Sequence, residues 1–484
     1  MFSALRGNAL MGRKETIREM ADRQAPDRLR WIERNEAYYA DDIRYMRFLV
    51  PEGLRILDVG CGTGELLAKL KPSRGVGIDL SPKMVEIARE RHPELEFVVG
   101  DVEDAGVLDA VEGPFDVIVL SDTIGYFDDC ETTLRALNAL CSPETRIVIA
   151  YYSHMWEPVL RLAEKLGGKM PQPELNWLST DDIAALLNLA DFELVKREWR
   201  QLVPKSLLGL GRLINRFLAP LPLIRRACLR NYLVARPRPS AQGMGEPSVS
   251  IIVPCRNERG NIEDAVRRLP RFCKDIELIY VEGNSQDNTW EECLRVKEAY
   301  SDWDIKCLKQ DGKGKADAVW KGFDHARGDI LMILDADLTV RPEDIPKFYR
   351  AIASGKGEFV NGTRMVYPME SDAMQFLNYL ANWGFARVFS YLLNQRFSDT
   401  LCGTKVLSRE SYRKVVANRA YFGDFDPFGD FDLIFGAAKL NLKTIEVPVR
   451  YASRSYGSTQ ISRFSHGWLL IKMVRFAFFK LKAL

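Results

Sequence analysis

The chain has 484 residues, more than one typical domain, and its composition is that of a folded protein. Hydrophobic residues make up 46% and charged residues 28%, which excludes a disordered tail, and the length excludes a small disulfide-stapled protein. The 68 lysines and arginines nearly cancel the 66 aspartates and glutamates. The net charge of +2 therefore gives no reason to expect nucleic acid as a partner.

Cysteines, histidines and apolar runs set further limits. Nine cysteines form no C-x-x-C pair and four histidines lie far apart, so we expect reduced thiols and no zinc site. The N-terminal region has no apolar run typical of a signal peptide, and no uncharged apolar run is long enough for a membrane-spanning helix. These features predict a cytoplasmic protein.

Two stretches alternate short Val/Ile/Leu runs with helical patterns, which predicts two α/β domains with parallel sheets. Between them, residues 237–247 carry three prolines and two glycines and are predicted to form a linker. The predicted organisation is a first domain over residues 1–236, this linker, a second domain over residues 248–464 and a basic amphipathic helix over residues 465–484.

A glycine-rich turn follows the first predicted strand. Residues 55–64 read Arg-Ile-Leu-Asp-Val-Gly-Cys-Gly-Thr-Gly, and such glycines let the backbone turn tightly beside a ligand. A dinucleotide fingerprint needs a glycine at position 65, where Glu65 stands, and a carboxylate at that helix start repels a pyrophosphate. The turn therefore suits an adenosyl ligand with a positive sulfonium and no phosphates.

Acidic residues end the following predicted strands. Asp79 comes 19 residues after Gly60, the usual place of a carboxylate that binds ribose hydroxyls. Asp101, then Ser121 and Asp122, follow the next two strands. Polar residues at the carboxyl ends of neighbouring parallel strands predict a ligand site at that edge of the sheet.

This half resembles class I S-adenosylmethionine-dependent methyltransferases over about residues 35–200, on the glycine turn together with Asp79 and Asp101. The resemblance implies a Rossmann-like fold and S-adenosyl-L-methionine as cofactor. It assigns the methionine part to Asp58, Gly60, Gly62 and Gly64, the ribose to Asp79 and the adenine amino group to Asp101. His154, beside aromatic residues, is either structural or a contact or base for the methyl acceptor, although methyl transfer needs no dedicated base.

In the second half, an apolar strand ends at Asp335-Ala-Asp337. Two carboxylates at i and i+2 after a buried strand can share a divalent ion and its diphosphate ligand, because the residue between them points away. Two further strands run into turns rich in acceptors, one ending at Glu258 and one spanning Glu282 to Asp287.

Together these motifs resemble the inverting family 2 glycosyltransferases of A-type (nucleotide-diphospho-sugar transferase) fold, over residues 248 to about 465. The resemblance implies a nucleotide-sugar donor, a nucleoside pocket, a lysine near the diphosphate, and Mg²⁺ or Mn²⁺ held by the paired aspartates. It assigns the nucleoside pocket to Pro254, Glu258, Glu282 and Asp287. It assigns Lys315 to the diphosphate and Asp335 with Asp337 to the nucleotide-sugar and its metal ion. Many members read Asp-Asp-Gly-Ser where this chain has Glu282-Gly-Asn-Ser, so the base preference stays open.

Three later stretches, Asp399–Lys405, Gly429–Asp432 and Arg454–Ser458, match places where such enzymes bind the acceptor and close on the diphosphate. The resemblance puts the catalytic base at Asp430 or Asp432. It puts a cation that faces the phosphates at Arg454.

The second half most resembles the branch of dolichyl-phosphate and polyprenyl-phosphate sugar synthases, which implies a lipid-phosphate acceptor. Residues 373–395 carry one formal charge and fit interfacial helices better than a spanning one. On an ideal helix, Lys472, Arg475, Lys480 and Lys482 fall on one side and apolar residues on the other. We expect peripheral attachment to the inner, anionic membrane surface, with docking on the domain's own core as the alternative.

A second basic segment lies at the end of the first domain. Residues 200–245 contain nine arginines and lysines and no acid, interleaved with apolar residues. This amphipathic extension can lie on anionic lipid or pack on its own domain as a helical hairpin.

The motifs predict a bifunctional enzyme that glycosylates a lipid phosphate or glycan and methylates in the same pathway. Two alternatives stay open. In one, the N-terminal domain only binds or regulates; in the other, the sugar acceptor is a polysaccharide hydroxyl.

Overall fold

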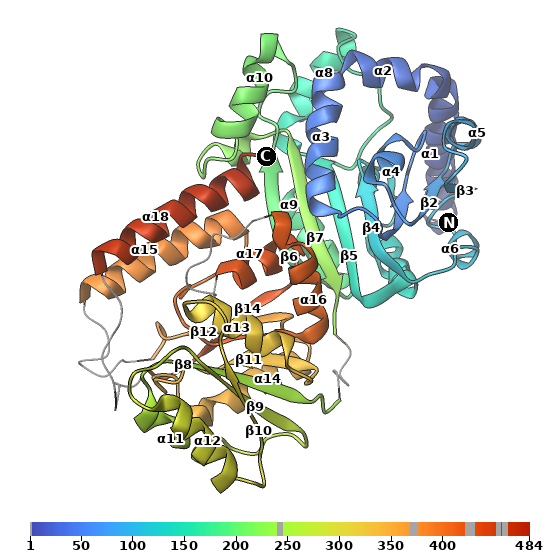
Figure 1. The fold of residues 1–484 in the computed structure, drawn as a ribbon. Coiled ribbons are helices and arrows are strands. Elements are labelled where there is room, and N and C mark those ends of the chain that lie inside the picture. Colours follow the sequence, from blue (N-terminus) through green and yellow to red (C-terminus); the bar gives the residue numbers. More distant parts are fainter. Residues whose placement is uncertain (1, 240–244, 368–375, 422–430, 452–455, 457–462) are drawn as a thin grey trace. The chain divides into compact units, whose positions relative to one another are not determined.

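The computed structural model describes residues 2–239, 245–367, 376–421, 431–451, 456 and 463–484. It divides into two compact units, Met1–Arg238 with Lys482–Leu484 and Pro239–Leu481 (Figure 1). Each unit is built on one seven-stranded sheet with helices beside it. The predicted class, two α/β domains in succession, is confirmed.

The sheet of the first unit has the order β3-β2-β1-β4-β5-β7-β6. Its strands are β1 (Arg55–Val59), β2 (Arg74–Asp79), β3 (Glu96–Val99), β4 (Phe115–Ser121), β5 (Cys141–Tyr152), β6 (Phe192–Arg200) and β7 (Arg230–Pro237). The first five strands pair in parallel, and β7 lies antiparallel between β5 and β6. The carboxyl ends of β1, β2, β3 and β4 therefore meet at one edge, as in other doubly wound folds.

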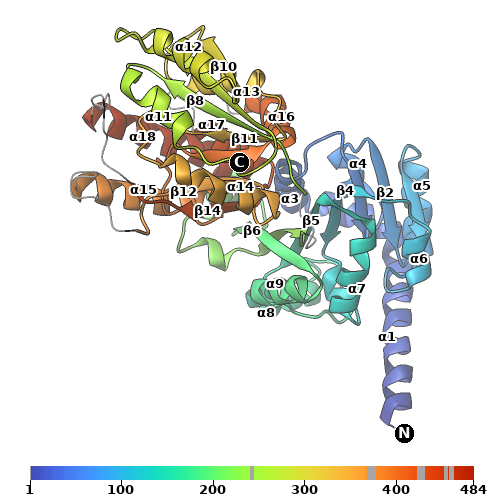
Figure 2. The same ribbon diagram turned by 90° about the horizontal axis from the view of Figure 1, so that it is seen from below.

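The helices of the first unit include three that precede the sheet in sequence. They are α1 (Phe2–Gln24), α2 (Arg28–Arg34), α3 (Glu36–Leu49), α4 (Glu65–Leu70), α5 (Pro82–Arg91), α6 (Ala105–Asp109), α7 (Cys130–Ala136), α8 (Glu157–Lys165), α9 (Thr180–Leu189) and α10 (Leu210–Leu213). The amino end of α1 projects from the domain (Figure 2).

The core of this unit follows from the apolar strands. Leu57, Ile118 and Ile149, on three neighbouring strands, are fully buried in one cluster. The hydrophobic effect, at about 25 cal/mol per Å² of apolar surface, makes such burial the main stabilising term. The rigid sheet then fixes the loops at its carboxyl edge.

The second unit has the strand order β10-β9-β8-β11-β13-β12-β14. Its strands are β8 (Val249–Cys255), β9 (Ile276–Glu282), β10 (Asp304–Lys309), β11 (Ile330–Ile333), β12 (Phe359–Thr363), β13 (Lys405–Ser408) and β14 (Thr444–Pro448). Strands β10, β9, β8 and β11 are parallel, whereas β13 is antiparallel to both β11 and β12. The turns after β8, β9 and β11 thus share one edge.

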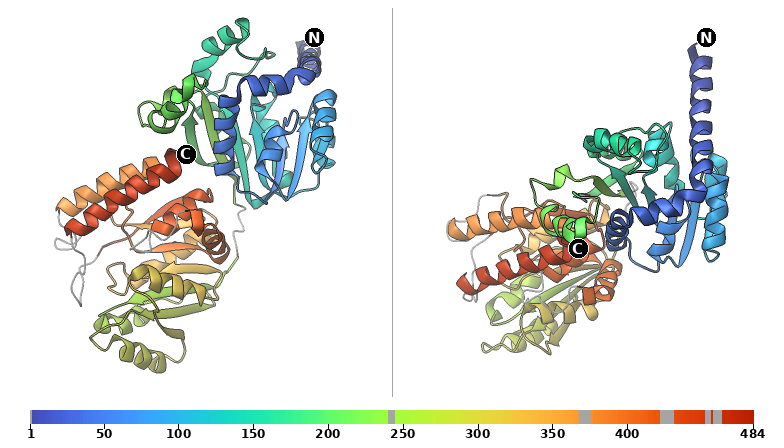
Figure 3. Two further views of the ribbon diagram at one scale, coloured as in Figure 1. Left: turned by 45° about the horizontal axis from the view of Figure 1, so that its top comes forward. Right: turned by 90° about the horizontal axis from the view of Figure 1, so that it is seen from above.

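The helices of the second unit are α11 (Ile262–Arg267), α12 (Thr289–Ala299), α13 (Lys315–Asp324), α14 (Ile345–Ala353), α15 (Phe376–Leu393), α16 (Arg409–Ala417), α17 (Phe431–Lys439) and α18 (Arg463–Ala477). Helices α15 and α18 contact each other and run side by side (Figures 1 and 3).

Much of the surface of helix α18 is buried inside the protein. The same holds for the turn that follows it, Phe478–Lys482. Leu470, Met473, Ala477 and Leu481 are buried. Lys480 donates from Nζ to the Tyr421 carbonyl at 2.6 Å, and Lys482 is fully buried. The interpretation of four cations on one solvent-facing side is therefore wrong for Lys480 and Lys482, since each lies against protein.

Candidate functional site

A cavity of about 290 Å³ opens at the carboxyl edge of the first sheet. Gly60, Gly62, Asp79 and Asp101 line it, four of the residues singled out in the sequence. Helices α1, α2 and α3 supply another wall, which encloses the sheet edge on the side where the strands end.

The glycine turn after β1 needs its glycines for two different reasons. Gly60, Gly62 and Gly64 all have φ between 53° and 78°, a left-handed conformation that residues with a Cβ rarely adopt. A Cβ on Gly60 would lie 2.2 Å from Oγ1 of Thr123, and one on Gly64 would lie 2.8 Å from the Phe97 ring. At Gly62 no atom lies within 4 Å of a Cβ, so this glycine leaves open space beside the cavity.

Asp79 ends β2 with both carboxylate oxygens fixed by backbone. Gly62 N–H donates to Oδ2 at 2.8 Å and Ser81 N–H to Oδ1 at 2.9 Å. Burial raises the pKa of Asp79 above its ordinary value, although these two N–H groups act in the opposite direction. A carboxylate held this rigidly can accept hydrogen bonds from a pair of ribose hydroxyls without reorganising.

Asp58 lies deeper than the cavity. Its side chain belongs to a residue that is 2% exposed, and neither Asp58 nor Gly64 is among the residues that line the cavity. Burial, with the nearby charge of Asp79, raises the pKa of Asp58 to about 7. At neutral pH this carboxyl group is divided between its protonated and ionised forms.

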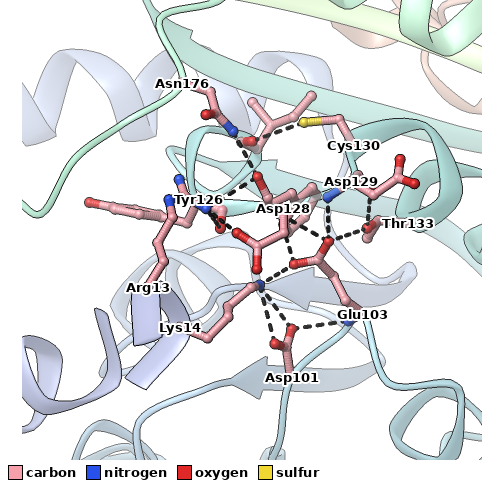
Figure 4. A network of polar contacts seen from close by, with 12 residues as sticks. Arg13, Lys14, Asp101, Glu103, Tyr126, Asp128, Asp129, Cys130, Thr133 and Asn176 are labelled. Atoms are coloured by element: carbon pink, nitrogen blue, oxygen red, sulfur yellow. Dashed lines mark hydrogen bonds and ion pairs between the residues drawn. The ribbon is translucent and has the colours of Figure 1, made fainter. Parts of the chain in front are cut away.

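Asp101 meets the N-terminal helix (Figure 4). Nζ of Lys14 lies 3.2 Å from Asp101 and also pairs with Glu103. The neighbouring Arg13 donates to the carbonyls of Gly125 and Tyr126 and to the Asp128 carboxylate. Helix α1 is thereby anchored across the end of the cavity at which Asp101 lies.

Sequence reasoning missed the contribution of α1. The residues of this helix that line the cavity are Lys14, Ile17, Ala21 and Gln24. Their spacing of three and four residues places them on one helix face, but the face mixes Lys14 and Gln24 with Ile17 and Ala21, so no apolar periodicity in the sequence marks this wall.

Asp122 is a second cavity residue that the motifs noted without a role. Its backbone has φ 61° and its N–H is bonded to the Ala150 carbonyl at 2.8 Å. Its side chain is 26% exposed and pairs with Arg230, whose side chain is fully buried and also lies 3.0 Å from Asp42. One guanidinium thus serves two carboxylates, and only Asp122 of the two lines the cavity.

His154 does not belong to this site. It is exposed and is not among the residues that line the cavity. Of the two interpretations left open by the sequence, contact with the methyl acceptor finds no support here.

In the second unit, the turns after β8 and β9 are joined by hydrogen bonds. Glu258 N–H donates to Thr289 Oγ1 at 3.0 Å, and that hydroxyl donates to Asp287. Asp287 also accepts from the backbone N–H of Arg259 at 3.2 Å. Glu258 and Asp287 are therefore brought together. Pro254 and Glu282 lie at the ends of β8 and β9 beside them.

The end of β11 brings Lys315 to Asp335. Their Nζ and Oδ1 atoms are 2.7 Å apart, while Asp337 Oδ1 accepts from the Thr339 hydroxyl at 2.8 Å. Burial alone would raise the pKa of Asp335, but Lys315, Lys405 and Arg364 together lower it below its ordinary value. Asp335 is thus an anion within a basic environment.

The stretch Asp399–Lys405 packs directly against this pair. A Cβ on Gly403 would lie 1.8 Å from Asp335 Oδ2, so only glycine fits there. Asp399 is fully buried and forms a two-point ion pair with Arg364, at 2.6 and 2.9 Å. That guanidinium lowers the pKa of Asp399 to about 2 against the opposing effect of burial. Asp399 therefore holds the loop in place.

Two of the predicted catalytic residues, Asp430 and Arg454, lie outside the described residues. Asp432 is described at the start of α17. Its side chain is 8% exposed, with Oδ2 3.6 Å from Nε of Arg419.

The donor atoms at the end of β11 suit a divalent ion shared with a ligand. Among the described residues no group of three or more acidic, histidine or cysteine side chains gathers as a metal site. Mg²⁺ is commonly bound through one or two carboxylates plus substrate phosphates, which Asp335 and Asp337 can provide together with a diphosphate.

No helix in the described ranges has the length and apolar character needed to cross a bilayer.

Comparison with known proteins places a different family on each unit. Residues 31–197 match the model of a methyltransferase domain, and residues 250–416 match that of glycosyl transferase family 2. A dolichol-phosphate mannosyltransferase from Pyrococcus furiosus is 30% identical over 217 residues, 44% of this chain. The chain spans 59% of the length of that relative.

Two solved structures illustrate the similarity. An S-adenosylmethionine-dependent methyltransferase from Thermotoga maritima is 19% identical, with a TM-score of 0.36, covering 46% of this chain and 99% of that one. Glucosyl-3-phosphoglycerate synthase from Mycobacterium tuberculosis, solved with Mn²⁺ and uridine diphosphate, is 15% identical with a TM-score of 0.36, covering 50% and 82%. On the two family matches, the chain joins a methyltransferase domain on a Rossmann-like sheet to a glycosyl transferase family 2 domain.

Proposed function

We propose that the chain is a bifunctional transferase. Its first domain methylates with S-adenosyl-L-methionine, and its second transfers a sugar with inversion from a nucleotide-sugar to a lipid-phosphate acceptor. The observation that carries this proposal is that one chain holds two sheet edges with polar residues suited to a ligand. One edge has the Gly60–Gly64 turn and Asp79, and the other has Lys315, Asp335 and Asp337.

For the first domain, the cavity supports the cofactor assignment. Gly60 and Gly62 would leave room for the methionine part, Asp79 would accept from the ribose hydroxyls, and Asp101 would accept from the adenine amino group. Asp58, below the turn, would place a negative charge near the cofactor's ammonium and sulfonium groups.

For the second domain, Lys315, Asp335 and Asp337 would bind the diphosphate of the donor. A Mg²⁺ or Mn²⁺ ion supplies positive charge there that offsets charge developing on the leaving group. Pro254, Glu258, Glu282 and Asp287 would line the nucleoside pocket at the neighbouring turns. Asp430 or Asp432 and Arg454 would serve the acceptor and the diphosphate.

A lipid-phosphate acceptor is supported by the name of the Pyrococcus furiosus relative and by the surface of α15 and α18. Large apolar side chains stand exposed on both helices, namely Leu380, Trp383, Trp468 and Ile471. The cations Lys472 and Arg475 lie exposed among them. Such a face suits peripheral binding to an anionic membrane, which we propose to be the cytoplasmic side.

The test is to incubate the full chain with S-adenosylmethionine, Mg²⁺, a panel of sugar-nucleotides and a polyprenyl phosphate, and to identify products by mass spectrometry. We expect a glycosylated lipid phosphate and a methylated product. Calorimetry with S-adenosylhomocysteine should show binding that Asp79→Ala abolishes. Sugar transfer without any methyl transfer would favour a regulatory first domain, and absence of both products would refute the proposal.

The acceptor is tested by Asp430→Asn. A polyprenyl phosphate is ionised at pH 7 and needs no base, so turnover should fall by about tenfold or less, whereas a hydroxyl acceptor loses roughly 10² to 10⁴ without its base. A loss beyond about a thousandfold at unchanged donor affinity would move the acceptor to a polysaccharide hydroxyl.

A further inference from the structure

The first domain exposes an unusual number of large apolar side chains in two segments. In the basic segment, Leu208 is 106% exposed and Leu223 is 95% exposed, and Leu207, Leu210, Leu213 and Phe217 are between 41% and 57% exposed. On α8, Leu162 is 56% exposed and Val159 51%, and beside its two ends Leu166 is 75% exposed and Met155 60%. Monomeric soluble proteins rarely expose contiguous apolar patches of this kind without a function.

The two segments converge on the same cavity. Pro204 and Lys205 of the basic segment line it together with Leu160 and Ala163 of α8. Trp156, just before α8, donates from its indole N–H to the Ala227 carbonyl at 2.8 Å, which ties the two segments together. Both segments that carry exposed apolar side chains therefore border the cavity, and we call these exposed side chains the leucine face (residues 155–166 and 207–223).

The backbone of the basic segment holds two leucines out toward solvent. Leu207 has φ 44° and Leu208 has φ 56°, a left-handed conformation that is uncommon for residues other than glycine and asparagine. Their exposed fractions of 57% and 106% mean that burial inside the domain does not repay this strain. Burial of both side chains against an external apolar partner would offset this strain.

The charge of this segment identifies the partner. Residues 200–245 contain no acid, and Lys205, Arg212, Arg216 and Arg226 are exposed among the leucines. Apolar side chains that enter the acyl boundary, beside cations that meet lipid phosphates, form the combination that binds an anionic bilayer surface. In the α8 part of the leucine face the acids are paired, Glu157 with Arg161 and Glu164 with Lys169, so the net positive charge of the face comes from the basic segment.

The inner side of the cavity has an apolar lining, which suits a methyl acceptor that comes from a lipid bilayer. Tyr38, Tyr152, Leu160 and Leu229 form an apolar cluster there, with Tyr38 and Tyr152 ring centroids 6.4 Å apart. Leu160, buried, and the exposed Val159 and Leu162 are neighbours on α8, so one short helix turns an apolar side both to the cavity and to the leucine face.

We propose that the leucine face docks the methyltransferase domain on an anionic lipid bilayer, so that its cavity takes a lipid-linked methyl acceptor from that surface. The acceptor class rests on the proposed function of the chain, whereas docking does not. In the transfer, an oxygen or nitrogen of the acceptor forms a bond to the methyl carbon, the sulfur–carbon bond breaks with its electron pair on sulfur, and the acceptor's proton passes to solvent or to Asp122.

Docking is tested on the full chain with vesicles of phosphatidylglycerol and phosphatidylcholine. The variant carries Leu166→Ser, Leu208→Ser and Leu223→Ser. The matched control carries Val99→Ser, Leu189→Ser and Leu294→Ser, three other leucine or valine side chains that are 39% to 53% exposed. We expect the variant's vesicle partition coefficient to fall at least about tenfold and the control's to stay within about twofold, since each buried leucine contributes measurably to transfer.

A second measurement separates docking from misfolding. An environment-sensitive fluorophore on Leu208→Cys should shift to the blue when vesicles are added, and the shift should grow with the phosphatidylglycerol fraction. The same label on Leu189→Cys should not shift. The triple variant should keep the parent's affinity for S-adenosylhomocysteine.

The outcomes are distinct. Equal partition of variant and parent, or no shift at position 208, would overturn docking by the leucine face. A parent that is dimeric in solution while the variant is monomeric would assign the face to a second copy of the chain and also overturn it. A parent that binds vesicles through this face but fails to bind S-adenosylhomocysteine would refute the proposed methyltransferase function and leave docking intact. Methylation of a water-soluble acceptor with unchanged rate in the variant would overturn the lipid-linked class.

Discussion

The two sheet edges treat charge in opposite ways. In the first domain the carboxylates at the edge, Asp79 and Asp58, are held by backbone N–H groups or by burial, and the pKa of each is raised. In the second domain Asp335 and Asp399 lie against Lys315 and Arg364, and the pKa of each is lowered. Burial at the first edge thus favours the protonated form of these two carboxyl groups, while the cations at the second edge favour the ionised form.

The charge of each edge can be compared with the charge of the ligand proposed for it. A sulfonium cofactor brings positive charge, which would favour the ionised forms of Asp58 and Asp79, whereas Asp101 and Asp122 at the same edge already pair with Lys14 and Arg230. A nucleotide-sugar brings a diphosphate, so the second edge needs cations, and Lys315 pairs with Asp335 until a ligand and its ion take those partners.

The largest effect on activity is expected at Asp337, in the second domain. Asp337→Asn should lower sugar transfer by at least about 10³-fold, because the ion that it helps to hold stabilises the leaving diphosphate by several kcal/mol. Affinity for S-adenosylhomocysteine should not change. The measurement is initial rate against Mg²⁺ concentration, with Asp311→Asn, an exposed carboxylate of the same domain, as control. Full activity of Asp337→Asn in EDTA would contradict the assignment.

The next largest effect, on the stability of the first domain, is expected from replacing the buried Arg230. Arg230→Met leaves Asp42 and Asp122 without their cation and should destabilise the first domain by about 3 to 5 kcal/mol, the usual result of breaking a buried ion pair. Urea unfolding followed by circular dichroism measures it. Arg197→Met, which removes a partly exposed arginine of β6 paired with the exposed Asp181, should change the free energy of unfolding by about 0 to 1 kcal/mol. Equal effects of both would show that the network adds nothing.

Asp58 gives the first domain a distinctive pH dependence. Its pKa is about 7 in the folded state and about 4 unfolded, so the folded state binds the extra proton between those values. Stability should therefore fall as pH rises from about 4 to about 7, by up to about 4 kcal/mol in total.

The check on this slope is Asp58→Asn, which cannot titrate and should remove most of it. Unfolding midpoints at several pH values between 4 and 8 provide the data. A parent and variant with parallel pH profiles would mean that Asp58 is ionised throughout.

The smallest effect is expected at Lys14. Lys14→Met removes the ion pairs that anchor α1 to Asp101 and Glu103, worth about 1 kcal/mol at their partial exposure. The association rate of S-adenosylhomocysteine should rise about twofold to fivefold as Asp101 becomes free, measured by stopped-flow fluorescence. Arg18→Met, which breaks a pair within α1 only, is the control and should leave the rate unchanged.

The sequence predicted what depends on local motifs. The glycine turn, Asp79 and Asp335 were located because their chemistry lies within a few residues and each follows a recognisable strand. Arg230 and Asp122 were not linked, because their contact joins residues 108 positions apart and no local pattern encodes it. Helix α1 was missed as a cavity wall, because the face that lines the cavity mixes Lys14 and Gln24 with Ile17 and Ala21 and shows no apolar periodicity.

Strand β7 sets a requirement on how the first domain is made. It is the last strand of its sheet in sequence, yet it lies between β5 and β6 and pairs with both. During synthesis the sheet stays in two parts until residue 237 leaves the ribosome, and two unpaired strand edges are open to aggregation in the meantime. A fragment cut where the methyltransferase match ends, at residue 197, would keep those edges permanently. The connection that carries residues 207–223 of the leucine face begins and ends at the paired residues Arg200 and Arg230, so a short hairpin loop could replace it and still deliver the closing strand.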